Sequence, residues 1–259
     1  MATCFFVKVY NDVLQGFDYL VTAKHTVRDM YNAGDGFVRL NSGEPGDLNQ
    51  GVTYISIPND DWLFHDDQSV DIAVRAFAPK LEGAIARVVI MTLKDNIVDG
   101  IAYVKSHGGN WPPLEGEEVL FVALMTHFPG VLANQTIVRR GSLALITDEQ
   151  LPGEYGPSDY YAVESQIYPG NSGAPVWALL DVVDDKSGAR TPKLWLLGVV
   201  TFAFPAAEEL QKKFDTLSTY LNLGIGLVTP IEKVVDILEK DKARRDKGIN
   251  QSTAGMAVK

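Results

Sequence analysis

The amino-acid sequence predicts an all-β protein with two helices near its C-terminal end. Short apolar runs of strand length recur along most of the 259 residues, and glycine and proline separate them. Hydrophobic residues make up 46% of the chain and charged residues 22%, as in ordinary soluble globular proteins. A chain of this length accommodates one large all-β domain or two smaller packed units. The expected strands include 4–10, 17–22, 36–41, 52–57, 84–91, 101–104, 117–125, 134–146, 160–167, 174–182, 193–204 and 224–228.

Apolar residues at helical spacing predict two helices in the last quarter of the chain. The first covers 206–221. The second begins after Thr229, whose hydroxyl is suited to cap the first turn, and Gly248 is suited to end it. The polar tail, 249–259, is expected to be disordered.

Charge and hydropathy exclude several classes of function. The net charge of −10 disfavours a general nucleic-acid role, because binding to phosphates requires a basic surface. No apolar stretch reaches the roughly 18 residues of a membrane-spanning helix. We therefore expect neither a nucleic acid nor a membrane among the partners.

Cysteine and histidine usage indicates neither disulfides nor a metal. Cys4 is the sole cysteine, which excludes an internal disulfide and fits a reducing compartment. Residues 1–7 lack the basic segment and long apolar core of a signal peptide, so we expect a cytoplasmic protein. His65, His107 and His127 show no metal-ligand spacing with Cys4. No metal or other cofactor is expected.

The stretch 166–176 presents a serine on a glycine-rich turn. Its sequence is QIYPGNSGAPV, in which Ser172 lies next to Gly173 and two residues after Gly170. Glycine lets backbone N–H groups approach a small group closely. The amides of Gly170 and Ser172 can then converge beside the hydroxyl as an oxyanion hole. The alternative is a Gly/Ser/Pro surface turn without catalytic function.

Two residues upstream can complete a serine nucleophile's machinery. His25 directly follows an apolar strand, and Asp71 is flanked on both sides by apolar residues, where a carboxylate usually has a partner. The chain order of His25, Asp71 and Ser172 is that of the chymotrypsin-type triad. It differs from the order in α/β-hydrolases, whose second motif glycine is replaced by Ala174. A serine hydroxyl needs such a base, and the base needs a carboxylate to orient it.

Five segments in this order resemble the trypsin-like serine peptidases. The resemblance is closest to the bacterial, HtrA-like branch without disulfides, and it extends from about residue 3 to 240. The segments are LVTAKH (20–25), VDIAV (70–74), PGNSGAPV (169–176), LGVVT (197–201) and GIGLVTPIEKVVDIL (224–238).

This resemblance implies a chymotrypsin-like fold of two packed, six-stranded antiparallel β-barrels. We expect the first barrel over 1–110, with His25 and Asp71, and the second over 111–248, with Ser172 and the C-terminal helix. The first apolar run corresponds to the strand that usually comes second in the family. The resemblance therefore leaves the opening strand of the first barrel unaccounted for.

Residue roles follow from the same resemblance. His25 would be the general base and acid, Asp71 its orienting carboxylate and Ser172 the nucleophile. The amides of Gly170 and Ser172 would form the oxyanion hole. The implied activity is that of a serine endopeptidase acting through an acyl-enzyme intermediate. Two alternatives stay open: a catalytically inactive peptide-binding or assembly module, and an esterase or acyl transferase on the same scaffold.

The resemblance also predicts how a substrate binds. Thr201, Phe202 and Ala203 would pair with an extended polypeptide. Thr201 is either the hydroxyl that hydrogen-bonds the triad aspartate or an ordinary strand threonine. Gln166 stands where trypsins have an aspartate, so we expect a neutral side chain in the primary specificity pocket. Asn171 replaces the aspartate that pairs with a freed N-terminus, which implies no such zymogen switch.

Two further expectations come from the position of elements and from the activity itself. The predicted helix 206–221 follows the substrate-pairing strand, so it would border the specificity pocket. An intracellular peptidase also has to be restrained, by narrow specificity, by an inhibitor or by a regulatory protein partner.

Overall fold

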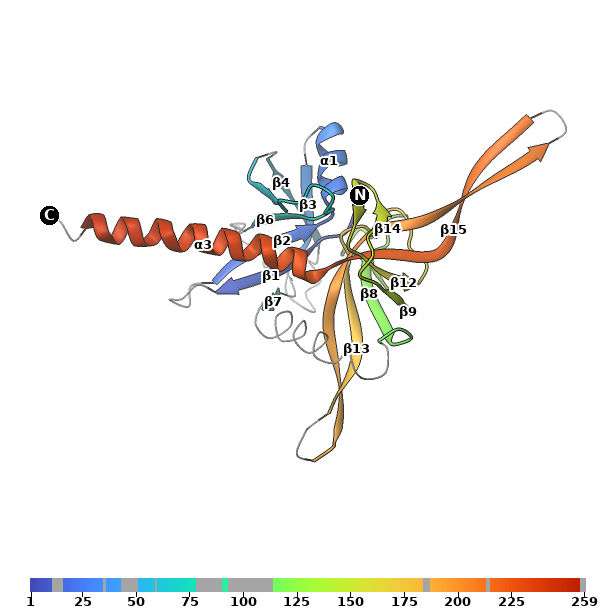
Figure 1. Ribbon diagram of the computed structural model, residues 1–259. Helices are drawn as coiled ribbons and strands as arrows, with labels where there is room; N and C mark the ends of the chain where they lie inside the picture. The colour runs from blue at the N-terminus through green and yellow to red at the C-terminus, as the bar shows by residue number, and fades with distance from the viewer. Residues whose placement is uncertain are drawn as a thin grey trace.

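The structure, a computed structural model, is built mostly of β-strands (Figure 1). It describes residues 1–10, 16–34, 36–42, 51–58, 60–77, 90–92, 114–183, 187–212 and 215–256. Within these ranges one barrel is closed and two helices are present. The connection 106–110 and the expected strand 101–104 lie outside the described residues, as does most of 84–91.

The N-terminal half is an open sheet within the described residues, not the closed six-stranded barrel that we expected. Five strands pair in the order β5-β6-β2-β1-β7, and β3 and β4 form a separate hairpin. Strand β1 pairs with β2 on one side and, parallel, with β7 on the other. The strands are β1 (Phe5–Tyr10), β2 (Gly16–Thr22), β3 (Gly36–Ser42), β4 (Gly51–Ile57), β5 (Trp62–Phe64), β6 (Ala73–Ala76) and β7 (Ile90–Thr92).

The C-terminal half confirms the predicted six-stranded antiparallel barrel. Its strands pair in the order β12-β15-β14-β13-β8-β9, and β9 closes the barrel on β12. Val119, Phe121 and Ala123 of β8 are fully buried at every second position, as expected for a strand with one face inward. A small hairpin of β10 (Leu151–Gly153) and β11 (Gly156–Ser158) lies between β9 and β12. The barrel strands are β8 (Glu118–Leu124), β9 (Thr136–Ile146), β12 (Tyr161–Glu164), β13 (Pro175–Val183), β14 (Arg190–Lys212) and β15 (Asp215–Pro230).

The helix predicted over 206–221 is wrong, because β14 and β15 stay paired as they leave the barrel. Their ladder continues through Ala206↔Leu221 and Leu210↔Leu217 to Lys212↔Asp215. Apolar residues spaced for one helix face thus sit opposite each other across two strands, where cross-strand pairs stabilise the hairpin. The resulting arm extends away from the barrel (Figure 1). No helix therefore borders a specificity pocket there.

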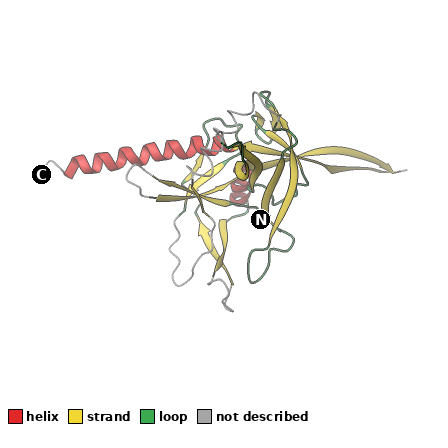
Figure 2. Ribbon diagram, turned by 90° about the horizontal axis from the view of Figure 1, so that it is seen from below, coloured by secondary structure: helices red, strands yellow, loops and turns green. Residues whose placement is uncertain are grey.

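The C-terminal helix is present and longer than expected. Helix α3 (Ile231–Met256) passes Gly248 without ending, so residues 249–256 are helical rather than disordered. Its predicted apolar stripe is buried and packs against the open sheet, including Val7 and Tyr19. Beyond the sheet the helix projects away from the strands (Figure 2). Among the described residues, no helix is apolar enough along sufficient length to cross a membrane.

A buried carboxylate fixes α3 to the open sheet. Asp241 is 4% exposed and accepts hydrogen bonds from the Tyr19 hydroxyl at 2.7 Å and from Arg244 and Arg245 at 2.6 Å. Burial raises the pKa of Asp241, but hydrogen bonds from Arg245 and Tyr19 outweigh this effect and lower the pKa below its ordinary value.

Asp241→Asn should therefore destabilise the protein by about 3 kcal/mol at neutral pH, because it breaks a buried charged network. A group whose pKa is lowered by folding stabilises above its unfolded pKa and loses that effect as pH falls through the folded value. The difference from wild type should thus shrink in acid, as measured by urea denaturation. Glu239→Gln removes a charge from an exposed position of the same helix and should change the free energy of unfolding little. Equal effects of the two substitutions would contradict this assignment.

Candidate active site

His25 and Asp71 are held together by two hydrogen bonds. His25 is the second residue of α1 (Lys24–Asn32), a helix absent from the sequence prediction, and Asp71 lies just before β6. The ring Nδ1 of His25 lies 2.6 Å from Asp71 Oδ2, and its backbone N–H donates to Asp71 Oδ1 at 2.9 Å. Asp71 is only 1% exposed, so its carboxylate is fixed inside the fold. With Nδ1 engaged, the other ring nitrogen of His25 has no hydrogen-bond partner among the described residues.

The electrostatic surroundings of His25 favour its protonated form. Burial lowers the pKa of His25, but the hydrogen bond to Asp71 and the charge of that carboxylate raise it above its ordinary value. Glu154 contributes in the same direction. Glu154 lies in the hairpin β10–β11, which contacts α1 through an ion pair with Arg28 at 3.0 Å. In the same hairpin, the Tyr155 ring lies 4.0 Å below the Lys24 ammonium.

The loop that carries Ser172 is closed by its own hydrogen bonds. The backbone N–H of Asn171 donates to Tyr168 O at 2.9 Å, and the Asn171 side chain accepts from the Tyr168 N–H at the same distance. Asn171 is 3% exposed, so this side chain is committed to the turn. Next along the chain, Ala174 donates to Asn171 O at 3.0 Å and Gly173 donates to Val200 O at 2.8 Å.

Two backbone amides of this loop are left free. The N–H groups of Gly170 and Ser172 find no acceptor in the part of the chain that the structure describes. These are the two amides that the sequence assigned to an oxyanion hole. Donors without a protein acceptor are available to a ligand oxygen, which is the property that such a hole requires.

Glycine is needed at both positions flanking the Asn171–Ser172 dipeptide. Gly170 has a φ of +94° and Gly173 a φ of +86°, a region that disfavours other residues. A Cβ at Gly170 would lie 2.1 Å from the Thr126 methyl, and one at Gly173 would lie 2.0 Å from the carbonyl oxygen of Thr3. Both glycines therefore allow close contact with neighbouring segments.

The structure does not join Ser172 directly to His25. No hydrogen bond of the Ser172 hydroxyl is formed with any described residue. The two segments are instead tied through Thr3, whose N–H donates to Ser172 O at 3.0 Å and whose carbonyl accepts from the Thr22 hydroxyl at 2.8 Å. Thr22 ends the strand that precedes His25. Catalytic hydrogen bonds are often long or misaligned without substrate, so this geometry keeps the pair as candidates.

The residues predicted to bind substrate lie along one exposed strand edge. From Thr201 to Ala203, strand β14 has β15 on one side, and no described strand pairs with its other side, because the ladder with β13 ends at Val199. The Thr201 hydroxyl lies 3.0 Å from that of Thr229, with no hydrogen bond to the triad aspartate within the described chain. Thr201 is therefore an ordinary strand threonine.

Gln166 is exposed beside β15. A Cβ added to Gly224 would lie 3.4 Å from the Gln166 side-chain nitrogen, and the Tyr168 hydroxyl donates to the Gln166 side-chain oxygen at 3.4 Å. The role of Gln166 in substrate selection stays a prediction.

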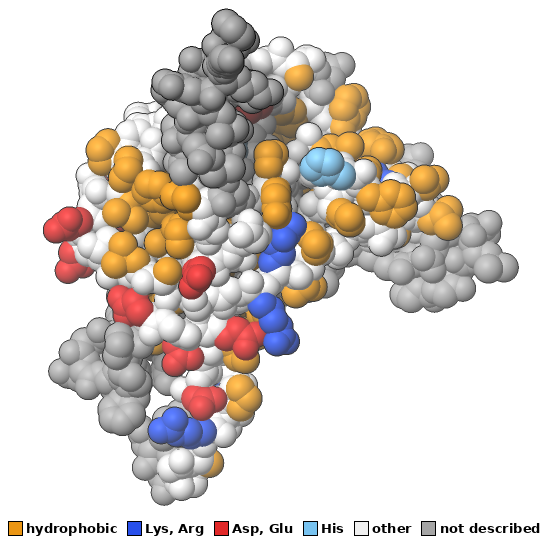
Figure 3. Space-filling view, turned by 90° about the vertical axis from the view of Figure 1, so that its right-hand side faces the viewer, with side chains coloured by type: hydrophobic (Ala, Val, Ile, Leu, Met, Phe, Trp, Pro, Cys, Tyr) orange, Lys and Arg blue, Asp and Glu red, His pale blue; other side chains and the backbone are white. Residues whose placement is uncertain are grey.

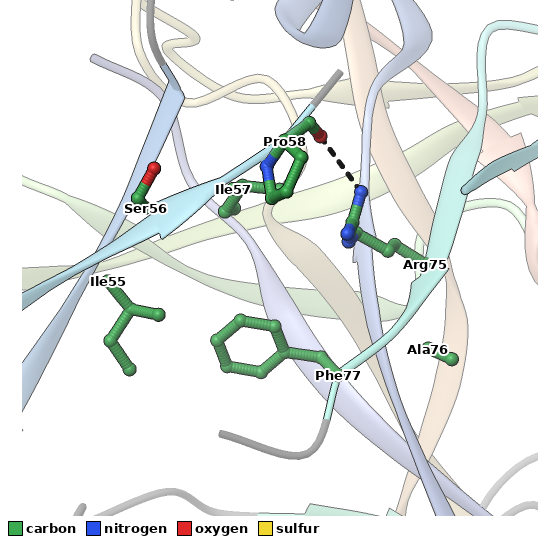
Figure 4. A pocket seen from close by; sticks show the side chains of 7 residues that line it. All are labelled: Ile55, Ser56, Ile57, Pro58, Arg75, Ala76 and Phe77. Carbon is green, nitrogen blue, oxygen red and sulfur yellow. Dashed lines mark hydrogen bonds between the residues drawn. The ribbon is translucent and has the colours of Figure 1, made fainter. Parts of the chain in front are cut away.

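Other groups offer less to a reaction. A small pocket between β4 and β6, lined by residues from Ile55 to Pro58 and from Arg75 to Phe77, contains none of the predicted catalytic residues (Figure 4). Its Arg75 donates to Pro58 O at 2.9 Å, so that cation serves the fold. Burial raises the pKa of the Cys4 thiol to about 12, which makes it a poor nucleophile. Within the described ranges, no group of three His, Cys, Asp or Glu side chains could hold a metal.

Sequence reasoning missed Thr3, Thr126 and Glu154. Each acts through a contact between segments far apart in the chain. No local pattern marks a threonine as the partner of a carbonyl more than 40 residues away.

Comparison with solved structures finds likeness to two protease domains. The MamO protease domain from Magnetospirillum magneticum, in its apo form, aligns with a TM-score of 0.47 and 11% identity, over 91% of this chain and 87% of that one. An inactive serine-to-alanine mutant of Rv3671c from M. tuberculosis aligns with a TM-score of 0.38 and 14% identity, over 89% and 83%. No protein-family model and no curated protein sequence matches the chain.

Titration of His25 tests the electrostatics of the site without any assay of activity. Asp71→Asn should lower the pKa of the His25 ring most, because it removes the strongest groups that raise it. Glu154→Gln should lower it less, and Glu149→Gln, an exposed control, should leave it unchanged. The measurement is an NMR titration of the histidine ring protons. A pKa that does not respond to Asp71→Asn would contradict the pairing.

Proposed function

We propose that this protein is a serine endopeptidase in which Ser172 is the nucleophile, His25 the general base and acid, and Asp71 the residue that orients His25. The observation that carries the proposal is the His25–Asp71 pair. The carboxylate engages Nδ1 at 2.6 Å and leaves the opposite nitrogen of the ring open. That is the tautomer that a base facing a serine hydroxyl needs.

The proposed reaction uses each group once in either half. His25 takes the Ser172 proton as the hydroxyl oxygen attacks the substrate carbonyl, and Asp71 stabilises the imidazolium. The amides of Gly170 and Ser172 donate to the oxyanion. His25 then gives the proton to the leaving amine, and an acyl-enzyme forms. Water, deprotonated by His25, releases the acid and restores the serine.

The surroundings favour an extended polypeptide as substrate. The open edge from Thr201 to Ala203 offers main-chain hydrogen bonds to an added strand. Hydrophobic side chains gather in patches on one face of the molecule (Figure 3). Beside the serine loop, segment 125–134 exposes four large apolar side chains, which suit apolar residues of a substrate: Met125, Phe128, Val131 and Leu132.

One observation favours a second candidate, a peptide-binding module without catalysis. The Ser172 hydroxyl has no hydrogen bond to His25 or to any other described residue. The edge of β14 and the exposed apolar side chains would serve a binding module equally well.

Labelling with a fluorophosphonate separates the two candidates. We expect the wild-type protein to be labelled at neutral pH and Ser172→Ala to lose the label. Ser56→Ala is the matched control, because Ser56 is an exposed serine in the pocket of Figure 4. Labelling that persists in Ser172→Ala would refute the nucleophile, and a wild-type protein that stays unlabelled would favour the binding module.

Removal of the other triad members should reduce turnover steeply. Asp71→Asn should lower kcat by about 10⁴-fold, since the imidazole loses its correct tautomer. His25→Ala and Ser172→Ala should each cost about 10⁶-fold, and the double variant should cost no more than either alone. Steady-state hydrolysis of a peptide substrate measures these ratios. Additive losses in the double variant would show that the two residues do not act together.

A further inference from the structure

We propose that the hydroxyls of Thr3 and Thr126 set the direction of the Gly170 amide from both sides, which makes them positioning residues for the oxyanion hole. The inference rests on the proposed function, because the hole matters only if Ser172 attacks a carbonyl. It concerns two residues outside the triad and outside the serine loop.

The argument begins with the planarity of the peptide group. An amide N–H shares its plane with the carbonyl of the preceding residue, so a partner that fixes this carbonyl also fixes the N–H. The carbonyl before the Gly170 amide is that of Pro169, and it accepts from the Thr126 hydroxyl at 3.2 Å. The carbonyl of Gly170 itself accepts from the Thr3 hydroxyl at 2.9 Å. Both peptide planes that flank Gly170 are thus held by threonine hydroxyls.

Gly170 needs such restraint more than its neighbours do. Its φ of +94° lies in a region that glycine enters and leaves without steric cost. A rotation of the Pro169–Gly170 peptide would turn the N–H away and present a carbonyl in its place. The plane of the Ser172 amide is held within the loop, since the Asn171 carbonyl accepts from the Ala174 N–H at 3.0 Å. The orientation of Gly170 therefore depends on residues outside the loop.

Thr3 is itself tightly fixed. It is 9% exposed, and its hydroxyl oxygen accepts from the Leu124 N–H at 3.0 Å. A hydroxyl has a single proton, which is then directed at the Gly170 carbonyl. The backbone N–H and carbonyl of Thr3 bond Ser172 and Thr22. The chain start lies near the middle of the molecule in both ribbon views, consistent with this central role (Figures 1 and 2).

Thr126 belongs to a loop, 125–134, that is anchored to the N-terminal half. Arg39 of β3 donates to Pro129 O at 2.8 Å and also to Gly130 O, and Asn41 accepts from the Asn134 N–H at 2.6 Å. The Thr126 methyl lies where a side chain at Gly170 would otherwise project. Thr126 therefore approaches the serine loop from a segment whose position is set elsewhere in the fold.

The kinetic test compares valine with serine at each threonine. Thr126→Val keeps the methyl and removes the hydroxyl, whereas Thr126→Ser keeps the hydroxyl. We expect Thr126→Val to lower kcat by about 10- to 100-fold with KM unchanged, since loss of a complete oxyanion donor costs about 10²- to 10³-fold. Thr126→Ser should stay near the wild-type rate. The acidic limb of the pH profile should not move, because His25 and Asp71 are untouched.

Thr3→Val and Thr3→Ser form the second pair. Thr3→Val should lower kcat in the same way, and the double valine variant should lose less than the product of the two single losses, because both act on one amide. Thr3→Val also leaves the Leu124 N–H without its acceptor, so its folding is checked by urea denaturation. The exposed position of the Thr126 hydrogen bond keeps the first pair free of that complication.

A second readout does not require activity. In ¹⁵N NMR spectra, the Gly170 amide resonance should shift or broaden in both valine variants and stay in place in both serine variants. The Ser172 amide is the internal reference and should stay unchanged throughout. Wild-type kcat together with an unmoved Gly170 resonance in Thr126→Val would overturn the proposal. If the wild-type protein neither cleaves peptides nor reacts with a fluorophosphonate, the proposed function fails, and the Gly170 resonance still decides whether the threonines position the amide.

Discussion

The hydrogen bonds of Thr3 connect the parts of the candidate site. Its backbone joins Ser172 to Thr22, and its side chain joins Gly170 to Leu124, all within 3.0 Å. Residues from the N-terminal sheet and from the C-terminal barrel are thereby held around one buried threonine. A chemistry that takes its groups from three distant segments depends on such a link, because small displacements of a reacting group reduce rates strongly.

The buried carboxylate of Asp71 imposes the second constraint. An ionised carboxylate that is 1% exposed is unfavourable unless it is fully hydrogen-bonded, and here it accepts from both the ring and the backbone of His25. The start of α1 and the segment before β6 are thus joined by the same bonds that orient the imidazole. Structure and proposed chemistry share this pair.

Local patterns predicted much of the C-terminal half. Alternation and turn residues indicated the barrel strands, and the apolar stripe of Ile231, Val234, Val235 and Leu238 indicated the start of α3 and its buried face. Flanking apolar residues singled out Asp71 as a carboxylate that needs a partner, and the structure supplies His25. The combined roles of His25, Asp71 and Ser172, and the domain limits, stay predictions.

The failures have physical causes beyond the local sequence. The segment 206–221 has helical spacing, yet pairing between β14 and β15 is available to it as a continuation of the barrel ladder and determines its structure. Helix α1 is short, and residues 24–32 gave no clear periodic signal. Gly248 does not end α3, since one glycine costs a helix interior only about 1 kcal/mol. The contacts of Thr3 and Thr126 arise from the tertiary fold alone.

The most direct test of the account is a crystal structure of the protein after reaction with a peptidyl phosphonate. The account predicts a covalent bond from the Ser172 hydroxyl oxygen to phosphorus, with a phosphonate oxygen within about 3 Å of the Gly170 and Ser172 amides. It also predicts the second ring nitrogen of His25 next to the serine oxygen. An adduct on another residue, or a phosphonate oxygen turned away from both amides, would contradict it.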